Sequence, residues 1–212
     1  LVIGILETGW FWIARQLEIS SLLYVSVAVV LPILVTGGIH LDGYMDTCDA
    51  LFSYGDREKK LEIMKDSHTG AFAVIYCGVY LLLSAGFYSG LYQSGSWIHI
   101  AVVGIGYLLS RTICGLATVW LPCAKNSGLD HMFQNNADRK TAKIALTIWF
   151  MGLICILGCL SLKAALFAIP LLGLGIIVFV SMIKKQFGGI TGDLAGFLLE
   201  ICELLLLLAA II

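Results

Sequence analysis

Charged residues and prolines are scarce in this chain. Only 13% of its 212 residues are Asp, Glu, Lys or Arg, and only three are proline. Average chains carry about 25% charged residues, so the composition excludes a soluble domain of ordinary make-up. The formal net charge is −1, and no basic patch with interleaved aromatic residues is present. We therefore expect no nucleic-acid partner.

Paired cysteines of the zinc-binding type are also missing. The seven cysteines include no CxxC pair. Most of them lie inside apolar runs, where cysteine behaves as a small hydrophobic residue. The sequence therefore predicts neither a zinc site nor a disulfide framework.

Apolar residues dominate instead and make up 59% of the chain. Runs long enough to cross a bilayer recur from one end to the other, and a backbone in lipid must satisfy its own hydrogen bonds. The sequence predicts an all-α, polytopic integral membrane protein, a helical bundle in the lipid bilayer with one catalytic domain over residues 1–212. We expect about seven spans, at residues 1–13, 21–39, 71–92, 97–121, 144–162, 164–183 and 192–212.

Basic residues are unevenly distributed between the connections. Ten of the 13 Lys and Arg residues lie in the connections after the second, fourth and sixth expected spans. Cytoplasmic loops are enriched in Lys and Arg, so we expect a multi-pass protein of the cell (inner) membrane whose polar loops face the cytoplasm. The ten residues are Arg57, Lys59, Lys60, Lys65, Lys125, Arg139, Lys140, Lys143, Lys184 and Lys185.

Three regularly spaced aspartates lie in the long polar stretch at residues 37–72. Asp42, Asp46 and Asp49 recur at intervals of four and three residues, which places them on one face of a helix. Like charges at that spacing repel each other, so the pattern indicates a bound cation. Oxygen ligands suit Mg²⁺, which takes one or two carboxylates together with substrate phosphates. The alternative is a solvated acidic helix face.

A Gly-rich turn before the last span is the second chemical signal. Glycines at 188, 189 and 192 let the backbone approach a ligand closely, and Thr191 is placed to cap the following helix. The free N–H groups of such a helix start can bind an anion. Asp193 and Glu200 follow on one helical face, and acids inside a span usually mark a site. The alternative is a helix cap with tight packing of small residues.

Four further residues are candidates on chemical grounds. His40 can serve as a general base or only as a hydrogen-bond donor. Lys65 can hold a phosphate as a point charge, and Asp66 follows it; both are equally ordinary at the end of the short charged helix expected over residues 56–68. Arg111 lies inside the fourth span, where an arginine needs an acidic partner, and the acidic cluster is the available one.

The motifs carry a resemblance to a known family. Residues 37–49, GGIHLDGYMDTCD, closely resemble the signature Gly-Gly-x-His-x-Asp-Gly-x-x-Asp-Thr-x-Asp of the cobalamin synthases, the adenosylcobinamide-GDP ribazoletransferases. Family members usually begin with a further segment containing Phe-x-Thr-Arg, which is absent here, and the chain begins with Leu1, so we expect a preceding segment to be missing. Further matches are residues 61–72, Ser110 with Arg111, Leu121 with Pro122, residues 128–129, and residues 188–200.

This resemblance implies the last assembly step of the cobamide nucleotide loop. Adenosylcobinamide-GDP would react with α-ribazole, or its 5′-phosphate, to give adenosylcobalamin, or its phosphate, and GMP. Mg²⁺ on the diphosphate would be held by Asp42, Asp46 and Asp49 with Asp193. Lys65 and Arg111 would steady the phosphates, and a carboxylate or His40 would take the proton. The substrate-binding set would be Gly37, Gly38, Asp66, Gly188, Gly189, Thr191, Gly192 and Glu200.

Two rival functions are weaker. A CDP-alcohol phosphotransferase also uses spaced aspartates, but its motif has Ala-Arg where this chain has Met45-Asp46. A cation-coupled transporter would carry acids at the bilayer midplane and inverted repeats, which are not visible here. We further expect the last span to pack against the aspartate helix in one cavity, with Arg111 or the metal cluster as partner of Glu200. A homo-oligomer is compatible with the sequence, which does not fix the oligomeric state.

Overall fold

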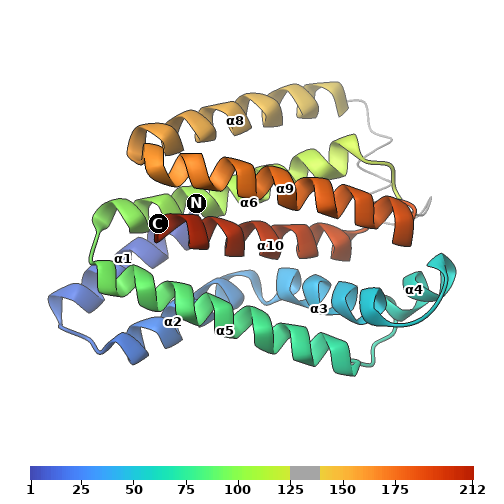
Figure 1. Ribbon diagram of the computed structural model, residues 1–212, viewed down its shortest axis with the longest axis horizontal. Helices are drawn as coiled ribbons and strands as arrows, with labels where there is room; N and C mark the ends of the chain where they lie inside the picture. The colour runs from blue at the N-terminus through green and yellow to red at the C-terminus, as the bar shows by residue number, and fades with distance from the viewer. Residues whose placement is uncertain (125–138) are drawn as a thin grey trace.

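The computed structural model describes residues 1–124 and 139–212, and nearly all of its regular structure is helical (Figure 1). Residues 125–138, with Lys125 and the family match at 128–129, lie outside the described part. The described helices are α1 (Val2–Gln16), α2 (Ser21–Thr36), α3 (Ile39–Phe52), α4 (Arg57–Ile63), α5 (Ala71–Ser94), α6 (Trp97–Trp120), α8 (Arg139–Leu160), α9 (Leu162–Gln186) and α10 (Gly192–Ala210).

Four of these helices, α5, α6, α8 and α9, are long and apolar enough to cross a membrane. The bent pair α2–α3 adds a fifth candidate if it counts as one span. The helical membrane fold is therefore confirmed, but the expected count of about seven is not. α10 has 19 residues, three of which are carboxylates, and α1 has only 15 residues. Length and composition alone therefore do not identify either helix as a membrane span.

A sharp bend separates α2 from α3 and corrects the expected second span. That span was predicted to run to residue 39, but α2 ends at Thr36 and α3 leaves it at an angle of 94°. Gly37 and Gly38 form the corner with φ of +66° and +76°. Two successive left-handed residues are readily accommodated only by glycine, so these glycines are explained by the bend itself.

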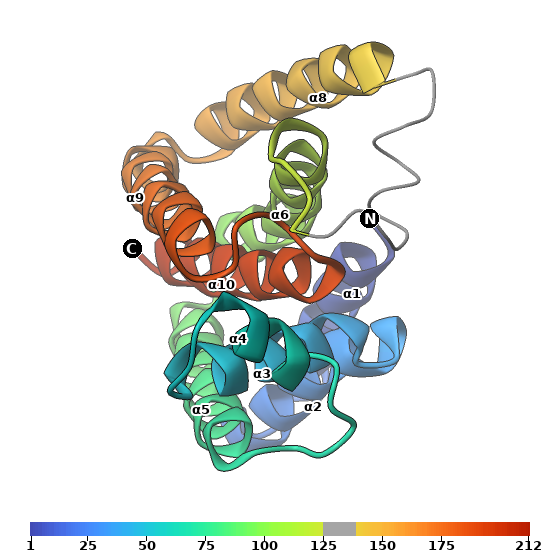
Figure 2. The ribbon, with the colours of Figure 1, turned by 90° about the vertical axis from the view of Figure 1, so that its right-hand side faces the viewer.

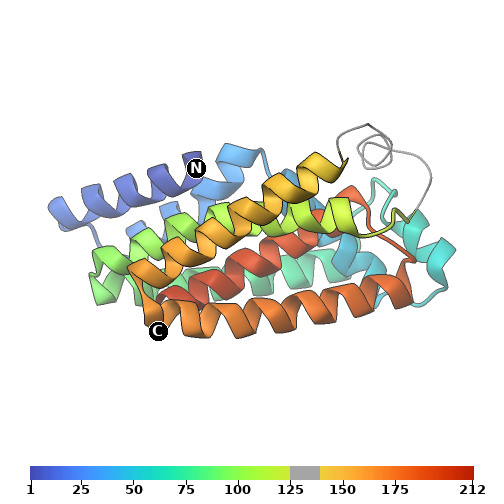
Figure 3. The same cartoon turned by 90° about the horizontal axis from the view of Figure 1, so that it is seen from above.

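α10 runs through the middle of the bundle, as the end-on view of Figure 2 shows. It packs against α3, α5, α6 and α9, and most of its side chains are buried. α8 lies at the outside of the bundle, along α6 and α9 (Figures 1 and 3). The packing of α10 against α3 confirms the expectation that the last apolar segment meets the aspartate helix.

The described parts of the polar connections gather at one end of the bundle (Figure 1). Ile190 forms a short β-bridge with Cys123, in which its N–H donates to Pro122 O at 2.8 Å. From α4, the Arg57 guanidinium donates to the carbonyl oxygens of Lys184 (2.8 Å) and Lys185 (3.2 Å) at the end of α9. The start of α4, the end of α6 and the segment from the end of α9 to Ile190 are thus held together.

The charged helix after the aspartates is shorter than predicted. We expected it over residues 56–68, but α4 ends at Ile63. Its start is as expected, since Asp56 caps it by accepting from Lys59 N. Beyond its end, Asp66 Oδ1 accepts from His68 N at 3.0 Å. Such a local side-chain-to-backbone bond competes with helical hydrogen bonding and favours a turn.

Candidate active site

The aspartates of α3 meet the start of α10 at the end of the bundle that carries the loops. Asp42, Asp49 and Asp193 all lie within electrostatic range of Asp46. The four carboxylates come from two helices separated by more than a hundred residues in sequence, which is the meeting of motifs that the sequence predicted. Asp42 is exposed, and the other three are partly buried.

Two glycines allow this close crossing of α3 and α10. A Cβ atom on Gly43 would lie 2.9 Å from Asp193 Cα and 3.0 Å from its carbonyl oxygen. A Cβ atom on Gly196 would lie 3.1 Å from the carbonyl oxygen of His40. Both contacts involve backbone of the opposite helix, which cannot move aside as a side chain can. The short separation of the two acidic motifs therefore depends on these glycines.

The donor set suits a hard divalent cation. Among the described residues, the charges that act on Asp46 are the carboxylates of Asp42, Asp49 and Asp193, so the helix crossing concentrates negative charge. No three His, Cys, Asp or Glu side chains within residues 1–124 and 139–212 stand close enough to form a metal cage by themselves. Mg²⁺ does not need one, because it keeps several waters and completes its shell with substrate phosphates. The residues present therefore fit Mg²⁺ bound together with a phosphorylated substrate.

In the Gly-rich turn before α10, the structure explains why two of the predicted residues, Thr191 and Gly189, are present. Thr191 caps α10, since its Oγ1 accepts from Leu194 N at 3.2 Å, as the sequence predicted. A Cβ atom on Gly189 would lie 2.5 Å from backbone atoms of residues 122–124. Gly188 has φ of +83° and lies beside Arg57, whereas Gly192 is exposed at the first position of α10. Gly189 is thus explained by backbone packing, without a ligand.

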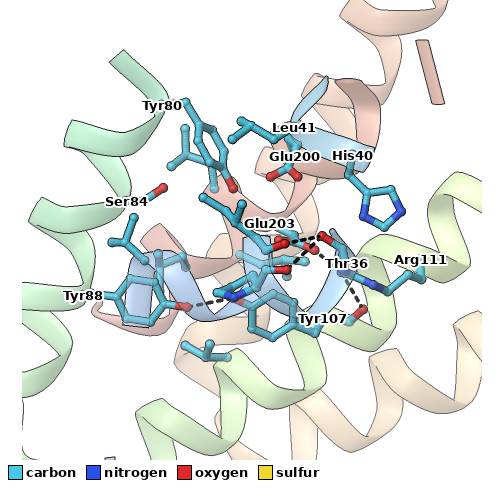
Figure 4. A pocket seen from close by; sticks show the side chains of 18 residues that line it. Thr36, His40, Leu41, Tyr80, Ser84, Tyr88, Tyr107, Arg111, Glu200 and Glu203 are labelled. Atoms are coloured by element: carbon cyan, nitrogen blue, oxygen red, sulfur yellow. Dashed lines mark hydrogen bonds and ion pairs between the residues drawn. The ribbon is translucent and has the colours of Figure 1, made fainter. Parts of the chain in front are cut away.

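Further along α10, a small cavity of about 30 Å³, lined by apolar side chains and by several polar ones, opens between α2, α3, α5, α6 and α10 (Figure 4). This volume holds about two water molecules. Arg111 enters from α6 and forms a hydrogen-bonded ion pair with Glu203 of α10. Ser110 Oγ accepts from Arg111 Nη1 at 2.9 Å and donates to Glu203 Oε1 at 3.4 Å. The Arg111 guanidinium also lies 5.3 Å from the centre of the Tyr107 ring.

The expected partnership of Glu200 needs correction. Its carboxylate lies beside Tyr80 and within electrostatic range of Arg111, but the direct ion pair of Arg111 is with Glu203, one helical turn further on. His40 also lines this cavity, within electrostatic range of Arg111, and its buried Nδ1 has no hydrogen-bond partner among the residues that the structure describes. The sequence did not single out Glu203 as a site residue, although its place three residues after Glu200 on one face was visible.

Lys65 and Asp66 lie in the exposed loop between α4 and α5. Asp66 interacts with His68, whose Nδ1 lies 2.7 Å from Asp66 Oδ1. Hydrogen bonds from His68 hold the pKa of Asp66 below its ordinary value of 3.8. This loop lies at the end of the bundle where α3 ends (Figure 1), but no contact among the described residues joins Lys65 or Asp66 to the carboxylate cluster.

The fold and this cluster define a helical membrane protein with an acidic site where two helices cross near the end of its bundle. The family described as cobalamin-5-phosphate synthase matches residues 1–211. Because that match covers nearly the whole chain, the chain belongs to this family.

Curated relatives agree with the family. The chain is 39% identical over 204 residues to an adenosylcobinamide-GDP ribazoletransferase of Lachnoclostridium phytofermentans, covering 95% of this chain and 76% of the relative. It is 36% identical over 210 residues to the protein of the same name in Geobacillus sp. (strain WCH70), covering 94% and 76%. A Clostridium perfringens protein of that name is 33% identical, with 96% and 80% covered. No solved structure gives a significant match.

Proposed function

We propose that this protein is an adenosylcobinamide-GDP ribazoletransferase, which joins adenosylcobinamide-GDP to α-ribazole or α-ribazole 5′-phosphate and releases GMP. The observation that carries this proposal is the meeting of Asp42, Asp46, Asp49 and Asp193 at the α3–α10 crossing, in a chain of the cobalamin-5-phosphate synthase family. A carboxylate cluster of this kind would hold Mg²⁺, which would neutralise negative charge on the diphosphate of adenosylcobinamide-GDP.

The reaction is a phosphoryl transfer in which one bond to phosphorus forms and one breaks. The ribose hydroxyl oxygen of α-ribazole bonds to the cobinamide-bound phosphorus, and the bond from that phosphorus to the bridging oxygen breaks. GMP leaves with the bridging oxygen, and the hydroxyl loses its proton. Bound Mg²⁺ would neutralise charge on the phosphate oxygens. Asp42, Asp46, Asp49 and Asp193 would hold and orient it, while a carboxylate of the cluster or His40 would accept the proton.

Arg111 acts from within the bundle in this proposal. Its guanidinium is anchored by Glu203 and Ser110, lies close to His40, and would steady phosphate charge at the inner end of the site. Lys65 and Asp66 would contact substrate from the exposed loop. Gly188 and Gly192 with Thr191 would present the N-terminal N–H groups of α10 to the diphosphate, and Glu200 would bind substrate beside Tyr80.

We also propose how the bundle lies in the membrane. α1, the bent pair α2–α3, α5, α6, α8, α9 and α10 together make seven crossings of the inner membrane. The end with the polar loops faces the cytoplasm, because ten of the 13 basic residues belong to connections assigned to that side. Charged nucleotide substrates then reach the site without crossing the bilayer.

Turnover by the purified protein tests the function. The full chain in detergent is mixed with adenosylcobinamide-GDP, α-ribazole and Mg²⁺, and GMP and the cobamide product are quantified by chromatography. We expect equimolar GMP and product, with neither formed when α-ribazole is left out. GMP release without α-ribazole would identify a hydrolase instead, and absence of product with both substrates present would refute the proposal. Omission of Mg²⁺, with a chelator present, tests the metal requirement separately.

A further inference from the structure

Gly70, at the start of α5, is in unusually close contact with the third aspartate. A Cβ atom built on Gly70 would fall onto the carboxylate of Asp49, touching Oδ1, Oδ2 and Cγ. The Asp49 carboxylate therefore occupies the space that any other residue at position 70 would need for its side chain.

The backbone conformation does not explain this glycine. Gly70 has φ of −83° and ψ of 171°, an extended conformation that any residue adopts. Gly37, Gly38 and Gly188 differ in this respect, since each has a positive φ. The requirement at position 70 is thus for space alone, and the space is taken by a carboxylate of the cluster.

Ring contacts fix α3 and the start of α5 relative to each other. Phe52, in the last turn of α3, stacks on Tyr76 of α5 with ring centres 4.2 Å apart and packs on Phe72 at 6.0 Å. Tyr44 Oη donates to Tyr76 O at 3.4 Å. With both helices held in this way, an added methyl group at position 70 would move the flexible carboxylate of Asp49 and leave the helices in place.

The first turn of α5 favours an anion at this place. Helix starts carry unsatisfied N–H groups and a positive partial charge. Gly70 is the N-cap residue of α5 and has no side chain with which to satisfy them. The carboxylate of Asp49 therefore lies where the start of α5 stabilises negative charge, in range of Asp46.

We propose that Gly70 is a positioning residue of the active site: its missing side chain lets the Asp49 carboxylate lie against the start of α5, in the orientation used by the carboxylate cluster. This inference rests on the proposed function for its catalytic consequence. The contact between Gly70 and Asp49 stands without it. Gly70 touches no substrate in this proposal and acts only through Asp49.

The test compares Gly70→Ala with Gly78→Ala, a matched control on the same helix, where an added Cβ meets nothing within 4 Å. For Gly70→Ala we expect kcat to fall about 10²-fold, the usual effect of misplacing a catalytic group by about 1 Å, with KM for α-ribazole little changed. Mn²⁺, titrated by electron paramagnetic resonance in the presence of adenosylcobinamide-GDP and without α-ribazole, should bind more weakly to Gly70→Ala and normally to Gly78→Ala.

A thermal double-mutant cycle tests the contact without any activity. Asp49→Ala vacates the space above residue 70, so Gly70→Ala should lower the melting temperature less in the Asp49→Ala background than in the wild type. Equal shifts in both backgrounds, or wild-type kcat and Mn²⁺ binding in Gly70→Ala, would overturn the proposal. A wild-type protein without transferase activity would instead refute the proposed function, while the cycle would still decide the contact.

Discussion

Removal of one partner of the Arg111–Glu203 ion pair is expected to destabilise the bundle strongly. Glu203 is 8% exposed and Arg111 is 28% exposed. Loss of one member of a buried pair typically costs about 3–5 kcal/mol, because the other charge remains buried without compensation. Part of the Arg111 side chain is exposed, and the Tyr107 ring still faces its guanidinium after Glu203 is removed. We therefore expect the lower end, about 3 kcal/mol, for Glu203→Leu.

Replacement of both partners should cost less than either single replacement. In Arg111→Met with Glu203→Leu, no charge remains to be compensated, and apolar pairs of similar volume are often as stable as the ion pair that they replace. For a chain of this size, 1 kcal/mol corresponds to about 2–4 °C in melting temperature. Each single variant should thus melt about 6–12 °C below the wild type, and the double variant should melt above both.

Thermal unfolding of the four proteins in one detergent measures this cycle. Additive shifts, with the double variant the least stable of the four, would refute the reasoning, because residues that do not interact give independent effects. Activity gives a second readout. The double variant should stay inactive although it is stable, since Arg111 is proposed to steady the phosphates.

Three further outcomes are expected. Asp46→Asn should lower kcat about 10²–10³-fold with little change in melting temperature, because it removes charge stabilisation rather than packing; near-normal turnover at saturating Mg²⁺ would exclude a metal role for this residue. Gly189→Ala should destabilise the protein by about 1–3 kcal/mol, since the added Cβ atom would lie 2.5 Å from backbone atoms of residues 122–124. Gly86→Ala, whose added Cβ atom meets nothing within 4 Å, should leave the stability unchanged. Equal melting temperatures of the two variants would contradict this prediction. Cysteine at position 67 should be shielded from an impermeant thiol reagent added to intact cells, and cysteine at position 94 labelled; the reverse pattern would invert the proposed orientation.

The positions and lengths of the apolar runs were sufficient to predict most of the helices. The apolar runs at residues 71–92 and 97–121 correspond closely to α5 and α6, because a long uninterrupted apolar helix has no alternative in lipid. The span boundary at residue 39 was wrong, since hydropathy does not record that two glycines of positive φ turn the chain by 94°. A pair of adjacent glycines within an apolar run is the signal that could have located this corner.

Spacing also predicted that the aspartates share one helical face, but it could not predict which residues surround them. Asp193 joins them because Gly43 and Gly196 let two backbones touch, a contact between segments that no local pattern connects. The same holds for Arg111, for which the sequence required an acidic partner. The choice between Glu200 and Glu203 depends on the register of α6 against α10, which is set by packing along both helices.

The glycines of the three matched sequence motifs illustrate why a motif and a ligand contact are different claims. Gly37 and Gly38 turn a corner, Gly189 admits a neighbouring backbone, and Gly43 admits Asp193, all without a ligand. Each still serves the site indirectly, because the corner, the loop contact and the crossing together bring the acidic motifs to one place. Gly70 differs, since the group that it admits is itself a carboxylate of the cluster. A substitution there should therefore change the chemistry before it changes the fold, whereas at Gly189 the order should be reversed.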